Sequence, residues 1–263
     1  MSQTVRAPDV NHGQVSGTQS ITRAFAVLNL FREEAGDLGV VQIAGRLELT
    51  LSTAHRIARA LVVEGYLAQD EGRERYRLGP QALLLGQAAQ RALGMDAART
   101  ILRELADRTG ESVNLGLLAG DHAVVIQRME SSQPLRFSME VGTRIELHAT
   151  SMGKSLLAFN SELQGYVDGL GEDLVQMTAK THSTVSGLRE DLAQIRLRGW
   201  SSDDEESMLG VRCVAAPVLD ARGQARAAIA IQAPAVRMPD DRFGALGPEV
   251  VRAANDLTHL LPL

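Results

Sequence analysis

The chain has 263 residues, an ordinary globular composition and a small negative charge. It is 44% hydrophobic and 22% charged, which excludes wholesale disorder, and its length suits about one to two domains. No uncharged run is as long as the roughly 18 residues that a helix needs to span a bilayer. The first 17 residues also lack the apolar core of a secretion signal. The single cysteine, Cys213, excludes an intrachain disulfide framework and a cysteine-cluster metal site, and it fits a reducing cytoplasm.

The net charge of −5 is unevenly distributed. The chain has 27 basic and 32 acidic residues. Residues 18–80 hold eight of each sign, whereas residues 81–263 hold 18 basic and 23 acidic residues. The overall acidity therefore does not weigh against a nucleic-acid partner for the first part of the chain. Aromatic residues make up only 3%, which argues against a base-stacking surface for single strands.

Three helices are predicted at the start of the chain. Residues 1–17 are polar and aperiodic, and we predict a disordered tail there. From Ser20 to Gly36, apolar residues recur with a helical period at Ile21, Ala24, Phe25, Leu28 and Phe31. A short second helix follows at residues 40–47, and a third runs from Leu51 to Gly65.

The third predicted helix has two contrasting faces. Its apolar stripe, Ala54, Ile57, Ala58 and Leu61, should be buried. The opposite face carries small or cationic side chains, namely Ser52, Thr53, Arg56, Arg59 and Ala60. Such a face can approach the floor of a DNA groove and bond phosphates or guanine edges. An ordinary solvated helix face is the alternative, but the preceding short helix and turn favour a helix-turn-helix.

A basic hairpin follows the third helix. Two short strands flank an Asp-Glu-Gly turn within residues 66–78. Arg73, Arg75 and Arg77 alternate and therefore share one side of the second strand, while Tyr76 and Leu78 share the other. A surface hairpin with solvated charges would show the same alternation. Together with the helices, residues 18–79 predict a winged helix-turn-helix.

The rest of the chain predicts a linker helix at residues 80–94 and an α+β domain at residues 95–263. The linker has a large apolar surface at Leu83, Leu84 and Leu85. Helices are expected at residues 96–110, 150–159, 188–198 and 240–261, and strands at 113–118, 123–129, 211–219 and 225–233. About 165 residues suffice to bury a core and enclose a small ligand.

Several of these segments resemble the IclR-type family of bacterial transcription regulators, over roughly residues 18–261. The motifs that carry the resemblance are QSITRA at residues 19–24, LSTAHR at 51–56, VGTRIELHATSMGKSLLA at 141–158, DDEE at 203–206 and GVRCVAAPV at 210–218. The resemblance implies an N-terminal winged helix-turn-helix, a linker helix and a GAF-like α/β effector-binding domain. It also implies a dimeric or tetrameric protein without a cofactor.

The resemblance also assigns candidate site residues. The DNA-binding candidates are Ser52, Thr53, His55, Arg56, Arg59, Arg73, Arg75 and Arg77. The effector-binding candidates are Ser151, Met152, Asp203, Cys213, Ala230 and Gln232. Members of the family that bind small oxo-acids have hydroxyls where this chain has Ala230 and Gln232, which implies a different, less polar effector.

Four polar features of the second domain have structural as well as functional interpretations. We interpret Cys213 as a packed pocket thiol and His148 as a hydrogen-bonded structural residue. Gly153-Lys154-Ser155 is not a P-loop, since His148 stands where the upstream glycine should be, so Lys154 is expected on the helix surface or in an ion pair. The acidic run from Asp203 to Glu206 is expected to form the first turn of a short helix. No metal site and no catalytic residue is predicted, although His182 and Asp203 could converge in space.

The leading functional hypothesis is a cytoplasmic, ligand-responsive transcription regulator, by default a repressor, that is not an enzyme. It would bind an inverted-repeat operator in double-stranded DNA as a dimer or a dimer of dimers, with no membrane partner. Its effector would be a small metabolite, such as an organic or aromatic acid. The alternative is an enzyme that uses the C-terminal pocket, with Cys213, His148 and Asp203 in one domain.

Overall fold

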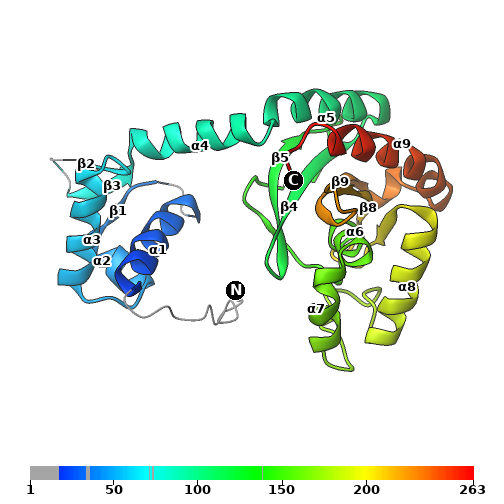
Figure 1. Cartoon of the computed structure of the whole chain (residues 1–263), viewed down its shortest axis with the longest axis horizontal. Coiled ribbons are helices and arrows are strands. Elements are labelled where there is room, and N and C mark those ends of the chain that lie inside the picture. Colours follow the sequence, from blue (N-terminus) through cyan, green and yellow to red (C-terminus); the bar gives the residue numbers. More distant parts are fainter. Residues whose placement is uncertain (1–17, 34–35, 71, 73, 138) are drawn as a thin grey trace. The chain divides into compact units, whose positions relative to one another are not determined.

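The computed structural model describes residues 18–33, 36–70, 72, 74–137 and 139–263. The chain divides into two compact units, residues 1–89 and 90–263 (Figure 1). The tail predicted at residues 1–17 and the wing residue Arg73 lie outside the described residues. Within the described part of the chain, no helix is long and apolar enough to cross a membrane.

The N-terminal unit contains three helices and a small antiparallel sheet. Its elements are α1 (Gln19–Glu33), β1 (Leu38–Gly39), α2 (Val40–Arg46), α3 (Leu51–Val63), β2 (Leu67–Asp70) and β3 (Arg75–Leu78). The strands lie in the order β1-β3-β2, so the predicted hairpin gains a third strand from the two residues before α2. That strand is too short to show a period in the sequence. The core of this unit includes Val27, Ile43, Ile57, Leu67 and Tyr76.

The predicted stripe of α3 is confirmed, and that of α1 is partly wrong. Ala54, Ile57, Ala58 and Leu61 are the buried residues of α3. In α1, however, Ile21 and Phe25 are 58% and 61% exposed, while Val27 and Leu30 are buried. Helix α1 has apolar residues on two sides, and only one of them packs on the core of its own unit.

Helix α4 (Pro80–Ala92) spans the boundary between the two units. None of its residues is buried, and Leu83, Leu84 and Leu85 are 64%, 53% and 59% exposed. The helix predicted as a linker is therefore present, and its three leucines are exposed in the single chain.

The C-terminal unit is built on a six-stranded antiparallel sheet in the order β6-β5-β4-β9-β8-β7. The strands are β4 (Ser112–Ala119), β5 (His122–Met129), β6 (Arg144–Ile145), β7 (Ser201–Asp204), β8 (Val211–Leu219) and β9 (Ala225–Pro234). The helices are α5 (Met95–Thr109), α6 (Ser151–Phe159), α7 (Gln164–Gly169), α8 (Val185–Arg198) and α9 (Asp240–Thr258), with 3₁₀ turns at Ser161–Leu163 and Ala235–Arg237.

Each face of this sheet has its own apolar core. Helices α5 and α9 pack on one face, where alternate residues such as Val214, Ile229 and Ile231 point toward them. Helix α6 packs on the other face against Ala215 and Ala230, and α7 and α8 add to that layer (Figure 1). The small residues Ala215, Ala228 and Ala230 let α6 approach the middle of the sheet closely.

The acidic run predicted as a helix start is instead the end of a strand. Asp203 and Asp204 belong to β7 and pair with Cys213 and Arg212 of β8. Glu205 then adopts a positive φ of 62°, which turns the chain away from the sheet. Pairing with the edge of β8 satisfies more backbone groups than an isolated helical turn would, and the local preference of carboxylates for a helix start gives way to it.

Helix α6 requires a glycine where it crosses the preceding loop. A Cβ at Gly153 would overlap the Cα of Leu147 and lie 2.5 Å from the carbonyl oxygens of Glu146 and Leu147. Backbone atoms cannot move aside as a flexible side chain can. The same substitution at Gly165, in α7, meets nothing within 4 Å.

We therefore expect Gly153→Ala to lower the free energy of unfolding by about 3 kcal/mol, the scale of a severe overpacking change. Gly165→Ala should leave it unchanged or raise it slightly, since alanine favours a helix. Urea unfolding of both variants followed by circular dichroism measures the difference. Equal stability of the two variants would contradict the close packing of α6.

Candidate functional site

Helix α3 presents a polar and cationic surface on the side opposite its core. Ser52, His55, Arg56 and Arg59 are exposed. The helix begins with a cap, because the Thr50 hydroxyl accepts a hydrogen bond from the Thr53 amide at 3.2 Å. A buried stripe fixes how the helix lies on its unit, so the four exposed side chains share one defined surface.

Two of the predicted DNA-binding residues have partners inside the protein. The Thr53 side chain is half-buried, and its hydroxyl accepts a hydrogen bond from Thr50 at 2.8 Å. Arg75 is also half-buried, and its guanidinium donates to the carbonyl oxygen of Asp37. Arg75 therefore ties β3 to the segment before β1, while Arg77 is exposed on the same strand.

The six predicted effector residues converge on the α6 face of the sheet. Asp203, Cys213 and Gln232 are directly paired across β7, β8 and β9, and the row continues to Ser112 on β4. All six are buried, at 9% exposed or less. The N-terminal residues of α6, Ser151 and Met152, lie in the layer above the sheet. The structure thus brings the six together, and their role stays a prediction.

A cavity of about 480 Å³ opens beside this row, and Gln232 is the one predicted residue on its wall. Its apolar walls are Phe137, Met139, Ile145, Met177, Met208 and Val211. Its polar walls are Glu140, Thr143, Arg144, Glu146, Thr150, Ser207 and Gln232. Residues 141–146 belong to the family motif at 141–158, but none of them was a candidate site residue. Sequence reasoning did not single out Phe137, Met139, Met177 or Met208, because no local pattern shows that they lie beside the sheet.

Gln232 connects the cavity to a buried amide network. Its side-chain oxygen accepts a hydrogen bond from Asn114 at 3.3 Å. The amide oxygen of Asn114 is buried without a hydrogen-bond partner in the protein. An unpaired buried acceptor is costly, so the Asn114 oxygen, which lies behind Gln232 and not on the cavity wall, favours a group that donates a hydrogen bond to it.

The carboxylate of Asp203 is occupied by its own turn. It accepts hydrogen bonds from the Glu206 amide at 2.7 Å, from the Ser207 amide at 3.2 Å and from the Ser207 hydroxyl at 2.5 Å. Burial raises the pKa of Asp203 to about 6, against the opposing effect of the Ser207 hydrogen bond. Asp203 therefore shapes the cavity wall by holding residues 203–207 in place.

Cys213 is a neutral thiol in this setting. Burial, with the nearby charge of Asp203, raises the pKa of Cys213 well above its ordinary value. The thiolate is the reactive form of cysteine, so this environment opposes nucleophilic chemistry. Cys213 is packed, as interpreted, but it does not line this cavity, so its role in a pocket stays a prediction. His148 is 6% exposed, and its Nε2 lies 2.9 Å from the carbonyl oxygen of Val175, a structural contact.

Lys154, on α6, is in a buried ion-pair cluster. The side chain is 1% exposed, and its ammonium donates to Asp191 at 2.7 Å and to Glu206 at 2.6 Å. His182 lies 3.3 Å from the same Asp191 oxygen. Burial alone would raise the pKa of Asp191, but the hydrogen bonds and positive charges of His182 and Lys154 lower it to about 2. His182 thus converges with Asp191 and Glu206, two partners that the sequence did not suggest.

Comparison with known proteins identifies both units. Residues 20–71 match the family described as the IclR helix-turn-helix domain. Residues 87–259 match the family described as the bacterial transcriptional regulator IclR C-terminal domain.

Similar whole proteins are transcriptional regulators. The HTH-type transcriptional regulator BhcR of Paracoccus denitrificans is 36% identical over 254 residues, covering 96% of this chain and 91% of that protein. The transcriptional repressor IclR of Escherichia coli is 34% identical over 257 residues, covering 96% and 94%. The crystal structure of a transcriptional regulator from Rhodococcus sp. RHA1 superposes with a TM-score of 0.78 at 30% identity, covering 92% of this chain and 98% of that one. The chain therefore belongs to the IclR family of bacterial transcriptional regulators.

Proposed function

We propose that the protein is a ligand-responsive repressor that places α3 in the major groove of double-stranded DNA. The observation that carries this proposal is the exposed surface of Ser52, His55, Arg56 and Arg59 on a helix whose opposite stripe is buried. Arginine reads guanine edges or bonds phosphates, and small hydroxyl side chains allow close approach. Arg77 on β3, together with Arg73, would contact the backbone as a wing.

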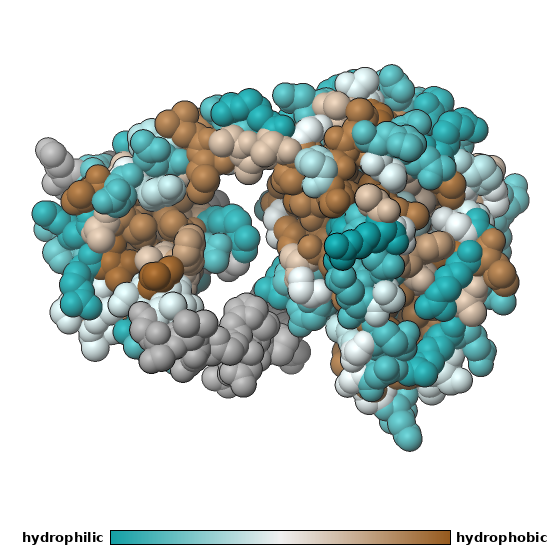
Figure 2. Space-filling model, viewed as in Figure 1, coloured by the Kyte–Doolittle hydropathy of each residue, from teal (hydrophilic) through white to brown (hydrophobic). Residues whose placement is uncertain are grey.

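We propose that a second copy of the chain covers the apolar side of α1 and α4. A groove of about 720 Å³ lies there, lined by Ile21, Phe25, Leu28, Leu78 and Leu85 among others. Figure 2 shows apolar side chains along α4 and on the N-terminal unit. The first part of the chain is neutral, so one such unit has little non-specific attraction to DNA. Two units joined through this groove would read an inverted repeat, as the symmetry of a dimer requires.

The effector is proposed to bind in the cavity beside Gln232. Phe137, Met139 and Met177 offer an apolar wall for a carbon skeleton or a ring, and methionine adapts to irregular shapes. The Gln232 amide nitrogen offers a hydrogen-bond donor for a polar end, and Arg144 offers a positive charge for a carboxylate. The Thr143 and Ser207 hydroxyls already donate to the Glu140 carbonyl and to Asp203, so they offer only acceptor oxygens. These walls fit a small organic or aromatic acid, whose binding would change the affinity of the DNA-binding units through linkage between the two sites. A bacterial transcription regulator of this kind would act in the cytoplasm.

DNA binding is tested with Arg56→Ala. We expect its affinity for the DNA upstream of its own gene to fall about 5- to 100-fold, the effect of losing one base or phosphate contact. Fluorescence anisotropy at several salt concentrations measures this loss and the slope of affinity against salt. Arg252→Ala, which removes an exposed arginine paired with Glu249 on α9, serves as the control. Unchanged affinity and slope in Arg56→Ala would contradict the proposed role of α3.

The dimer interface is tested with Phe25→Glu. A carboxylate in an apolar interface would be desolvated without a partner, so we expect the assembly to fall by one step, from dimer to monomer or from tetramer to dimer. Light scattering of the full chain measures the mass. Leu197→Glu changes a single leucine that is 82% exposed on α8 and should leave the mass unchanged. An unaltered mass in Phe25→Glu would place the interface elsewhere.

The effector site is tested by a thermal-shift screen of small organic and aromatic acids. An acid that binds the folded protein raises its unfolding temperature, and we expect Gln232→Met to remove that rise by deleting the cavity amide. The unfolding temperature without acid shows whether the variant is folded. Gln87→Met, on the exposed surface of α4, should keep the full rise. If the acid raised the unfolding temperature of Gln232→Met by the same amount, the acid would bind elsewhere than in this cavity.

A further inference from the structure

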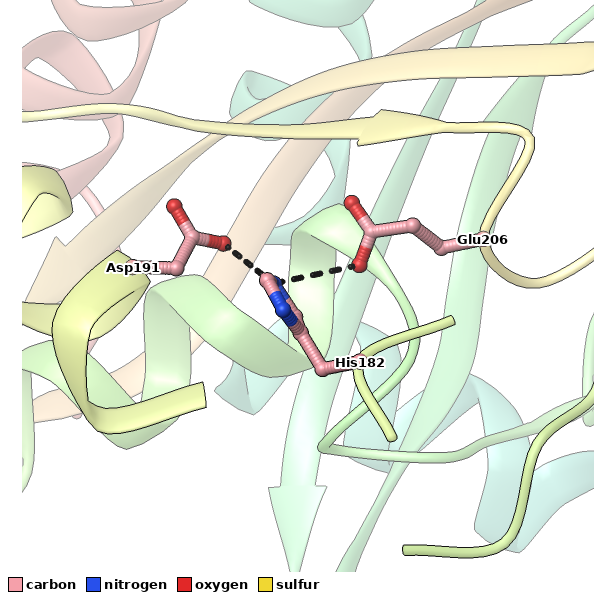
Figure 3. A group of neighbouring side chains, drawn as sticks. All are labelled: His182, Asp191 and Glu206. Carbon is pink, nitrogen blue, oxygen red and sulfur yellow. Dashed lines mark hydrogen bonds and ion pairs between the residues drawn. The ribbon is translucent and has the colours of Figure 1, made fainter. Parts of the chain in front are cut away.

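We propose that His182, Asp191 and Glu206 form a binding site for a divalent metal ion of the zinc class, separate from the effector cavity. The three residues come from three segments: the loop before α8, α8 itself and the turn after β7. Figure 3 shows the imidazole of His182 pointing between the two carboxylates. One ligand atom from each residue can be chosen so that all three lie within 4.8 Å of one another.

The spacing of the donor atoms suits a tetrahedral ion. His182 Nε2 lies 3.3 Å from Asp191 Oδ2 and 3.8 Å from Glu206 Oε2. Two ligands at about 2.0–2.1 Å from a tetrahedral zinc ion lie about 3.3–3.5 Å apart, so small side-chain movements would close the site. One imidazole nitrogen with two carboxylate oxygens leaves a fourth position for solvent, as in open zinc sites.

Lys154 positions the two carboxylates from the buried side. Its ammonium bonds Asp191 Oδ2 at 2.7 Å and both oxygens of Glu206 at 2.6 and 2.8 Å. A carboxylate oxygen has two lone pairs, so it can accept from Lys154 and still bind an ion on its other side. His182 is 29% exposed, whereas Lys154 is 1% exposed. The Lys154 ammonium would therefore lie on the buried side of the two carboxylates, and the metal ion would lie on the more exposed side, beside His182.

The charge around the site leaves room for a cation. Asp191 and Glu206 carry two negative charges, and Lys154 balances one of them. Glu190 adds another on the wall of a 610 Å³ cavity that His182, Asp191 and Glu206 also line. Arg198 pairs with the other Asp191 oxygen at 3.7 Å and balances the second charge. The Glu190 carboxylate therefore supplies the excess negative charge that faces the cavity, from which an ion would enter.

The site shares its supporting segments with the effector cavity. The Glu206 carbonyl accepts a hydrogen bond from the Thr181 hydroxyl at 2.6 Å, and Thr181 also receives the Met177 amide at 3.0 Å. Met177 and Ser207 line the effector cavity. An ion that joins His182 to Glu206 would therefore fasten two walls of that cavity. This regulatory consequence depends on the proposed effector site, whereas ion binding itself does not.

The test is competition between the full chain and a coloured zinc chelator. We expect the metal-free protein to bind one zinc ion whose affinity falls about tenfold or more in His182→Ala, since loss of even an outer-shell partner has effects of that size. His122→Ala is the matched control: His122 also pairs with an aspartate, Asp121, at 2.9 Å, but without a second carboxylate. It should bind zinc like the parent.

A spectroscopic measurement keeps the result independent of stability. Cobalt(II) in a tetrahedral site absorbs visible light strongly, so the parent protein should show these bands and His182→Gln should lose them. Unfolding temperatures of the apo variants confirm that each is folded. Absence of zinc binding in the parent, or equal zinc affinity in His182→Ala and the parent, overturns the proposal and leaves Lys154 as the cation of this cluster. Neither result bears on the DNA-binding or effector experiments.

Discussion

The burial of the Lys154 ammonium is the constraint on which the packing of the C-terminal unit depends. An unpaired charge in a protein interior costs several kcal/mol, and this side chain is 1% exposed on a helix that packs into the sheet. Asp191 and Glu206 must therefore reach it. The first fixes α8 against α6, and the second fixes the turn after β7. Both carboxylates come from segments far along the chain, so the pairing forms only when the whole unit folds.

The turn after β7 is also stabilised by a second carboxylate, that of Asp203, which accepts hydrogen bonds and makes no ion pair with Lys154. Asp203 accepts the amides of Glu206 and Ser207 and the hydroxyl of Ser207. Because the Asp203 oxygens already accept these hydrogen bonds, a ligand would have to break one of them before it could donate to Asp203. The hydroxyls of Thr143, Thr150 and Ser207 on the cavity wall also donate inside the protein. The donors that remain for the proposed effector are the Gln232 amide nitrogen and the Arg144 guanidinium. If an effector binds here as proposed, it would be recognised by the shape of the apolar walls, by the Gln232 amide and by the charge of Arg144.

Sequence reasoning succeeded where one period decides a residue's environment. The stripe of α3 was predicted fully, since that helix packs on one side only. In α1 the same reasoning failed at Ile21 and Phe25, because apolar periodicity does not say whether the partner is the same chain or another. The prediction of a helical turn at Asp203–Glu206 was wrong for a different reason. The carboxylates locally favour the start of a helix, but the edge of β8 offers hydrogen-bond partners to the backbone of this segment. The fold class could be predicted from the mixture of helical segments and hairpin-forming strands. The ion-pair cluster could not, because it joins residues 154, 182, 191 and 206, which no local pattern connects.

The two failures have different functional weight. The correction at Asp203–Glu206 shows that the Asp203 oxygens are already hydrogen-bonded beside the cavity. The exposed apolar side of α1 leads to the proposal that two chains, rather than one, bind DNA together. A neutral winged helix with few exposed cations gains little from phosphate attraction alone. Joining two such units through Phe25 and Leu85 would convert two weak contacts into one bivalent contact, whose strength depends on the distance between the paired helices. If the proposed effector altered this distance, it would need to supply only a modest coupling free energy, about 1–3 kcal/mol, to release the DNA. Weak binding by a single unit would then make regulation by a small ligand possible.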